Sequence, residues 1–342
     1  MPAALRRALL RHYSSNHRDL PWRRTRDPYR IWVSEVMLQQ TRVAAVVERY
    51  EDFLRRFPDL HALAAAREEQ VCEAWAGLGY YSRARNLHAA ARRLVAGNRG
   101  RIPTTASDLR KLPGIGRYTA GAIASIAFGE PVPAVDGNVE RVLSRLFAIA
   151  DPVGSAAALR RVWELAARLA ACDRPGELNQ ALMELGAGLC SPRAPGCGAC
   201  PVRRFCAAYA EGEPTRYPRR VTRRTHRPTL ELAFLWHRTR AGVWLERRPL
   251  GGLWAGLWQL PGEEGPAARA RLGERFGVPL TRRIAAVRHE LSHRVVMASV
   301  YASSPATTIV RRTTLRGFAD PLDAPLSAVA RRAISAALRE GA

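Results

Sequence analysis

Hydrophobic residues recur every three or four positions through most of the first 210 residues, which is the spacing of helices that bury one face. Residues 42–57 show it most clearly, and Thr41 just before them is suited to cap such a helix. The same spacing predicts helices over residues 63–75, 84–95, 119–128, 139–149, 156–170 and 179–189. We therefore expect a mainly helical domain over residues 1–212.

The pattern changes after residue 228. Short apolar segments at 230–236 and 242–247 are separated by a turn-sized stretch, which predicts two strands of a hairpin. Helical spacing returns at residues 267–276 and 327–339. A smaller α+β domain is thus expected over residues 229–342. Residues 213–228 predict a basic surface linker, because 214–228 hold six arginines, three prolines and no acidic residue.

The charge of the chain points to a polyanionic partner. There are 54 Lys and Arg residues against 30 Asp and Glu, a net charge of +24, and such an excess attracts nucleic acid or an anionic membrane surface. No run of 18 apolar residues occurs, which predicts no membrane span, and no secretory leader is seen. With six cysteines in a chain of this kind, we expect reduced thiols, a cytoplasmic location and no disulfide framework.

Four cysteines lie within seventeen residues: Cys190, Cys197, Cys200 and Cys206. Both tetrahedral zinc and a [4Fe–4S] cluster accept four thiolates. A zinc ribbon usually pairs two C-x2-C units, and only one is present here, so the spacing favours the cluster over zinc without excluding zinc. Cys72 and Cys172 lie in helical patterns and are expected to be small buried residues.

A second motif, Leu-Pro-Gly-Ile-Gly at residues 112–116, joins two helical segments. Gly114 and Gly116 allow a tight turn that exposes consecutive backbone N–H groups at a helix N-terminus, where an anion is favoured. The motif is typical of a helix–hairpin–helix, expected here over about 109–127, that grips a DNA backbone without reading its sequence.

These residues together resemble a known family. The hairpin, the segment 135–139 (Val-Asp-Gly-Asn-Val) and the four cysteines resemble the endonuclease III superfamily of DNA glycosylases. Segments 20–23, 32–41 and 77–87 are similar to the MutY family of adenine DNA glycosylases, and the resemblance covers residues 5–340. It implies a mainly α helix–hairpin–helix glycosylase domain with one [4Fe–4S] cluster on the four cysteines, followed by an α+β Nudix-like domain. It further implies a monomer that excises adenine opposite 8-oxoguanine or guanine in double-stranded DNA.

Breaking a purine N-glycosidic bond needs one protonated carboxyl group as the acid and one ionised carboxylate facing a positively charged sugar. Glu35 lies in a strongly apolar stretch that would raise its pKa. Asp136 precedes a helix and is also simply suited to cap it. The resemblance assigns the acid to Glu35 and the carboxylate to Asp136, with Asn138 in the same motif. Tyr118 stands where strand-cleaving relatives have a Schiff-base lysine, and Lys111 is the only lysine of the chain.

The resemblance also implies the DNA contacts. Trp22, Arg23 and Gln180 correspond to an adenine pocket; Gln40 and Tyr80 would wedge into the base stack, and Leu38 and Arg83 would contact the opposite strand. From composition alone, core packing is the favoured interpretation of Trp22 and Tyr80. Residues 248–262 resemble the approach to the metal site of Nudix hydrolases, but the Glu-rich box is missing, which predicts a binding module in which Ser292 and His293 contact 8-oxoguanine.

Three alternatives remain at this point. They are a bifunctional glycosylase and lyase acting on oxidised pyrimidines, a non-catalytic DNA-binding protein, and a nucleotide hydrolase with a basic tail. The position of Tyr118 disfavours the first, the Glu35 and Asp136 pair disfavours the second, and the missing Nudix box disfavours the third.

Overall fold

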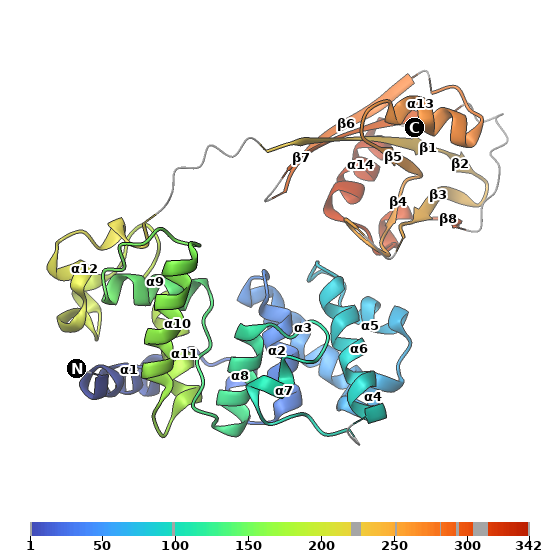
Figure 1. Cartoon of the computed structure of the whole chain (residues 1–342). Coiled ribbons are helices and arrows are strands. Elements are labelled where there is room, and N and C mark those ends of the chain that lie inside the picture. Colours follow the sequence, from blue (N-terminus) through green and yellow to red (C-terminus); the bar gives the residue numbers. More distant parts are fainter. Residues whose placement is uncertain are drawn as a thin grey trace. The chain divides into compact units, whose positions relative to one another are not determined.

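The computed structural model describes residues 2–97, 100–219, 227–249, 252–280, 282–291, 294–303 and 314–340. The chain forms two compact units, one built almost entirely from the first 223 residues and the other from Arg224 onward (Figure 1). In the part that is described, no helix combines the length and apolar character needed to cross a membrane.

The first unit is helical. Its longer helices are α1 (Pro2–Asn16), α2 (Pro28–Leu38), α3 (Val43–Arg56), α6 (Ser82–Gly97), α8 (Arg117–Phe128), α9 (Gly137–Leu146), α10 (Ala156–Ala170) and α11 (Pro175–Ala187). Shorter helices are α4 (Leu60–Ala65), α5 (Glu68–Ala74), α7 (Ala106–Leu109) and α12 (Ala207–Ala210). Several begin at side chains that accept a hydrogen bond from the first turn, as N-caps do: Asp27, Asp59, Thr105, Asp136 and Ser155.

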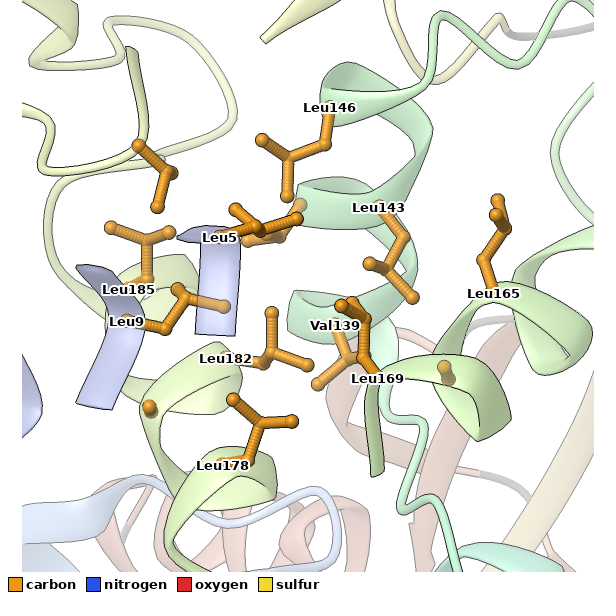
Figure 2. Packing of buried hydrophobic residues seen from close by; sticks show 14 of the residues in the cluster. Leu5, Leu9, Val139, Leu143, Leu146, Leu165, Leu169, Leu178, Leu182 and Leu185 are labelled. Atoms are coloured by element: carbon orange, nitrogen blue, oxygen red, sulfur yellow. The ribbon is translucent and has the colours of Figure 1, made fainter. Parts of the chain in front are cut away.

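One hydrophobic cluster holds α1, α9, α10 and α11 together. Leucines from each of these helices interdigitate in Figure 2, and most are less than 5% exposed. Burying each such side chain contributes about 1.5–3 kcal/mol. Helices α9 and α11 approach so closely that a Cβ on Gly186 would lie 2.6 Å from the Cβ of Asn138. This packing fixes the start of α9, where Asp136 and Asn138 lie, against α11.

The second unit is a two-sheet α+β fold. One sheet has the order β5 (Gly262–Glu264), β1 (Thr229–Trp236), β7 (Val295–Ala302), β6 (Arg282–Glu290), with β1 and β7 parallel. The other joins β2 (Arg238–Thr239), β3 (Gly242–Arg247) and β4 (Trp258–Gln259), and β8 (Leu315–Phe318) pairs with β3.

Two helices cover opposite faces of β1. Leu232, Phe234 and Trp236 pack in one cluster with α14 (Ala328–Arg339), whereas Ala233 and Leu235 pack in another with α13 (Ala268–Phe276). Alternate side chains of a strand point to opposite faces, which explains this division and the nearly continuous apolar run of the strand.

Three sequence expectations were wrong in detail. Residues 230–236 and 242–247 are strands but belong to different sheets, and the tight turn closes β2 onto β3 instead. The helix expected over 63–75 is broken between α4 and α5. Thr41 does not cap α3, because its hydroxyl donates to the carbonyls of Gln39 and Leu78 and Arg42 is the N-cap residue.

Candidate active site

A cavity of about 780 Å³ in the first unit gathers most of the predicted site residues. Its walls come from the turn before α2 and from α2, α8, α9 and α11, so residues as far apart in sequence as Arg18 and Ala187 meet there. The predicted residues that line it are Trp22, Arg23, Glu35, Leu38, Gln40, Gly114, Gly116, Tyr118, Asp136, Asn138 and Gln180.

Glu35 provides a carboxyl group with an unusual pKa. It lies on α2 and is only 6% exposed. Burial raises its pKa to about 7; the hydroxyl of Tyr118 opposes this, and the nearby negative charge of Asp136 adds to it. The Tyr118 hydroxyl donates a 2.7 Å hydrogen bond to Oε2 of Glu35. The group is therefore close to half protonated at neutral pH.

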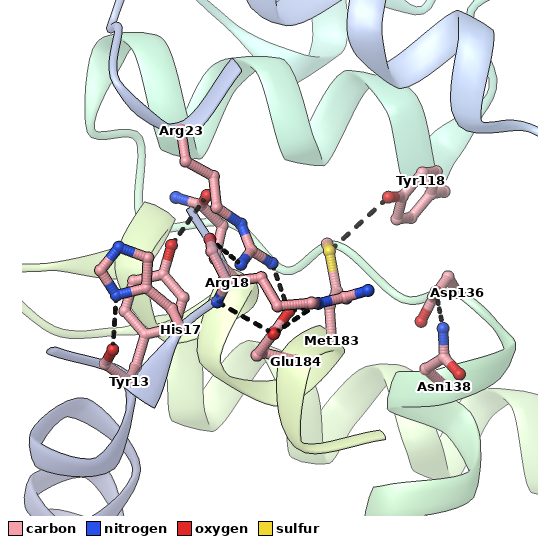
Figure 3. Close-up of polar contacts among 10 residues, drawn as sticks. Tyr13, His17, Arg18, Arg23, Tyr118, Asp136, Asn138, Met183 and Glu184 are labelled. Carbon is pink, nitrogen blue, oxygen red and sulfur yellow. Dashed lines mark hydrogen bonds and ion pairs between the residues drawn. The ribbon is translucent and has the colours of Figure 1, made fainter. Parts of the chain in front are cut away.

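Asp136 is the N-cap of α9, and two hydrogen bonds hold its carboxylate in place. Its Oδ1 accepts a 2.8 Å hydrogen bond from the Val139 N–H, and its Oδ2 accepts one of 2.8 Å from the Asn138 amide (Figure 3). The N-terminus of α9 further stabilises its negative charge. Capping and chemistry are compatible here, because one ionised carboxylate can serve both.

Asn138 also connects this carboxylate to the cysteine segment. Its Oδ1 accepts a 2.9 Å hydrogen bond from Arg141, and Arg141 donates another of 2.9 Å from Nε to the carbonyl of Cys190. A hydrogen-bonded path thus runs from Asp136 to the first of the four cysteines.

Glu184 on α11 was not predicted from the sequence, yet it anchors the arginines of the cavity. It accepts hydrogen bonds from Arg18 at 2.7 and 2.9 Å and from Arg23 at 2.5 Å (Figure 3). Burial works to raise the pKa of Glu184, but the two arginines outweigh it and lower the pKa to about 2. Glu184 lies four residues after Gln180 and therefore on the same face of the helix, and this spacing could have identified it from the sequence.

The hairpin after α7 provides free backbone donors. Gly114 has a φ of 75°, and a Cβ there would lie 2.6 Å from the Cβ of Asn86, so glycine is required. Gly116 is the N-cap of α8, and the first bond within the helix is from Ala120 N–H to its carbonyl at 3.0 Å. The N–H groups of residues 117–119 precede that bond and have no acceptor within the helix.

Residues 33–168 match the HhH-GPD superfamily of base excision DNA repair proteins, and residues 232–336 match the NUDIX domain. The chain is 38% identical over 375 residues to the adenine DNA glycosylase of Homo sapiens, which covers 90% of this chain and 69% of the human protein. It is 34% identical over 252 residues to that of Buchnera aphidicola, covering 73% of this chain and 72% of the relative.

The chain belongs to the adenine DNA glycosylase family. With the enzyme of Arabidopsis thaliana the identity is 43% over 296 residues, 75% of this chain, and the chain spans 47% of that longer relative. Among solved structures, a thermostable thymine-DNA glycosylase matches with a TM-score of 0.55 and 28% identity, over 61% of this chain and 97% of the other. A non-covalent endonuclease III–DNA complex matches with a TM-score of 0.51 and 25% identity, over 62% and 98%. The predicted fold class is confirmed.

Some residues predicted by likeness to the adenine DNA glycosylase family lie outside the cavity. Tyr80 is 58% exposed, with a φ of 47°. Arg83 is buried, and its guanidinium donates to the carbonyls of Val36, Met37 and Leu78 at 2.8–2.9 Å. This geometry favours a role for Arg83 in holding the last turn of α2 next to Leu78.

The four cysteines surround one small cavity whose other lining is largely apolar, with Leu185, Leu189 and Val202 among it. Within the described residues, no three Cys, His, Asp or Glu side chains converge as ligands of a single metal ion. A [4Fe–4S] cluster takes four thiolate ligands, so four cysteines that line one cavity fit that group.

A buried arginine holds the cysteine segment in place. Arg145 is 2% exposed and donates hydrogen bonds to the carbonyls of Ser191, Pro192 and Tyr217 at 2.7–3.0 Å. It also donates to Sγ of Cys190 at 3.2 Å. The conformation of the segment therefore depends on α9 as well as on any bound group.

The Nudix-like unit has its own cavity, in which each of three glutamates pairs with an arginine. Arg275 contacts Glu246 and lies 3.1 Å from Glu263, and Arg248 lies 2.5 Å from Glu264. Carboxylates engaged in this way are poor ligands for Mg²⁺. Ser292 and His293, the predicted 8-oxoguanine contacts, lie outside the described residues.

Proposed function

We propose that the protein removes adenine paired with 8-oxoguanine or guanine in double-stranded DNA, by hydrolysing the N-glycosidic bond and leaving an abasic site. The observation that carries this proposal is the cavity in which Glu35, Tyr118 and Asp136 share walls with Gln180 and Arg23. An acid, an ionised carboxylate and a base-recognising amide meet there, on a chain whose relatives are adenine DNA glycosylases.

Glu35 is the general acid of this scheme. With a pKa of about 7, it carries a proton at neutral pH that it can donate to a ring nitrogen of adenine. The carboxylate left behind keeps the hydrogen bond from Tyr118. The base then departs as a neutral leaving group.

Asp136 acts on the sugar. As the bond to the base lengthens, positive charge develops on the deoxyribose ring, and a fixed carboxylate stabilises it without reorganising. The Val139 N–H and the Asn138 amide hold that carboxylate in place. Water then attacks the sugar and gives its proton to the Glu35 carboxylate, which completes the hydrolysis and restores the acid.

Adenine must leave the base stack to reach these groups, which costs a few kcal/mol. Trp22 and Gln180 line the cavity as its base-contacting walls, while Gln40 and Leu38 lie at the end of α2 on the same cavity. We infer that Gln40 and Tyr80 fill the gap in the duplex, since Tyr80 is largely exposed.

Strand cleavage is expected to be absent or weak. The position of a Schiff-base lysine is taken by Tyr118, whose hydroxyl is committed to Glu35. Lys111 does not line the cavity; its ammonium lies 2.7 Å from Asp108 on an exposed surface. No other lysine exists in the chain.

The hairpin and the basic surface would hold the DNA. The N–H groups of residues 117–119 and the N-terminus of α8 suit a backbone phosphate. The net charge of +24 adds a salt-dependent attraction. DNA as the partner also implies that the protein works at the nucleoid.

We further propose a [4Fe–4S] cluster on Cys190, Cys197, Cys200 and Cys206, which line one cavity. When bound, it would supply four Fe–S bonds that tie the segment together, and it would present the exposed Arg203 and Arg204 toward phosphates. The second unit would recognise 8-oxoguanine through the loop between β6 and β7 as a binding module, since the glutamates of its cavity are already paired.

The test uses a duplex with adenine opposite 8-oxoguanine, incubated with the protein and divided into halves with and without alkali. Breakage of the adenine strand only after alkali is the expected result. Breakage without alkali would instead show a lyase, and an intact strand in both halves would refute the proposal. A duplex with adenine opposite thymine measures the mispair preference.

A further inference from the structure

Tyr13, in the last turn of α1, lies behind the cavity and was not singled out by any sequence motif. It is 7% exposed. Its ring stacks on His17 with centroids 4.7 Å apart and planes at 25°, and the Arg23 guanidinium lies 5.6 Å from its ring centroid (Figure 3). The ring is therefore fixed on two sides.

The hydroxyl of Tyr13 donates a 3.0 Å hydrogen bond to Oε1 of Gln180, across 167 positions of sequence. Among the described residues, this oxygen is the acceptor for the hydroxyl proton. If the Gln180 amide were turned by 180°, its NH₂ group would donate to the Tyr13 oxygen, and the hydroxyl proton would have to turn away from Gln180, its acceptor among the described residues. The hydrogen bond thus favours the orientation in which Oε1 faces Tyr13.

Two cavities meet at Gln180. Tyr13 lines a second cavity of about 390 Å³, which shares Arg23 and Gln180 with the cavity that holds Glu35. Tyr13 itself does not line the cavity of Glu35. The amide is therefore held from the rear, and its NH₂ group and the second lone pair of Oε1 remain for a base in front.

The orientation of that amide has a chemical consequence. On its Watson–Crick edge, adenine presents the N6 amino donor beside the N1 acceptor, whereas hypoxanthine presents the O6 acceptor beside an N1–H donor. A glutamine amide pairs with either edge as donor and acceptor together, but the two bases require opposite orientations.

We propose that Tyr13 is a positioning residue that fixes the Gln180 amide in the orientation that accepts adenine and disfavours 6-oxopurines. This inference rests on the proposed function, because it assigns a determinant of base choice within the same site. Tyr13 of α1 would thus be one of the residues that determine which base the site accepts.

The test compares single-turnover excision of adenine and of hypoxanthine, each placed opposite 8-oxoguanine, by four proteins: wild type, Tyr13→Phe, Gln180→Leu and the double variant. Phenylalanine keeps the ring stacking and removes only the hydroxyl. We expect Tyr13→Phe to lower the adenine-to-hypoxanthine rate ratio about tenfold, the size of one hydrogen bond. In the Gln180→Leu background the same change should leave the ratio unmoved.

Tyr29→Phe is the matched control. Its hydroxyl also makes a buried hydrogen bond, at 2.8 Å to the carbonyl of Phe57, but it does not line the cavity. It should change thermal stability without changing the ratio. An unchanged ratio in Tyr13→Phe, or an equal effect in both backgrounds, would overturn the inference while wild-type adenine release upholds the proposed function. If the wild type releases no adenine, both fail.

Discussion

The hydroxyl of Tyr118 lies 2.7 Å from Oε2 of Glu35 and donates its proton to that carboxyl group. Two opposing influences meet there. Burial raises the pKa of Glu35 strongly, while this hydrogen bond stabilises the ionised form and lowers it, and the result is about 7. The carboxyl group of Glu35 can therefore both carry and release a proton near neutral pH.

The first prediction concerns pH. Glu35 must be protonated to act as an acid, so single-turnover excision should be constant below pH 7 and fall about tenfold per unit above it. Tyr118→Phe removes the hydrogen bond that lowers the pKa and should move the descending limb to higher pH. A limb that stays in place, or moves to lower pH, contradicts this assignment.

The second prediction concerns the acid itself. Glu35→Gln keeps the shape and removes the proton, and excision should slow about 100- to 10 000-fold while binding to the mispaired duplex is retained. Glu164→Gln, an exposed residue of α10, serves as the control for the same chemical change. Full activity in Glu35→Gln would remove Glu35 from the mechanism.

The third prediction concerns Glu184. Its pKa of about 2 means that ionisation stabilises the folded state above the ordinary pKa of 4.5, by about 3 kcal/mol, and that this stability is lost as the pH falls toward 2. Glu184→Gln should lower the melting temperature at pH 7 and also slow adenine excision, because Arg23 loses its partner.

The comparison for Glu184 is Glu177→Gln, a change on the same helix that breaks a pair with Arg174 nearer the surface. It should cost about 1 kcal/mol or less. Equal losses of stability in the two variants would show that the pairing of Glu184 with two arginines contributes no more to stability than the single pair of Glu177.

The fourth prediction concerns Arg145. Arg145→Gln leaves the carbonyls of Ser191, Pro192 and Tyr217 without their donors, which should cost about 3 kcal/mol. Iron and sulfide per chain should fall together with stability. Arg161→Gln, on the exposed face of α10, should change neither. Full iron content in Arg145→Gln would show that the cysteine segment does not depend on Arg145.

Much of the active-site cavity could be predicted because its residues occur in contiguous motifs. Short sequence motifs contain four of these residues: Glu35, Gln40, Asp136 and Asn138. Asp136 lines the cavity and is also the N-cap of α9. Tyr13 and Glu184 could not be found in this way. Their partners lie more than 160 positions away, and only the packing of α1 and of the turn that follows it on α11 brings them together.

For the same physical reason, the sequence does not reveal burial or the pairing of distant segments. Nothing local distinguishes Arg83, whose guanidinium is buried against backbone carbonyls, from an arginine exposed to DNA. The turn between 230–236 and 242–247 suggested that these segments pair with each other, yet β1 pairs with β7, more than sixty positions further along.

Arg145 has a consequence for the order of assembly. Its hydrogen bonds reach residues 45 to 72 positions away and shape the cysteine segment from a helix that belongs to the main core. Small zinc domains fold only when their metal arrives, but here hydrogen bonds from the protein core hold the cysteine segment. We therefore expect the polypeptide to fold first and the proposed cluster to be inserted afterwards, between cysteines that are already in place.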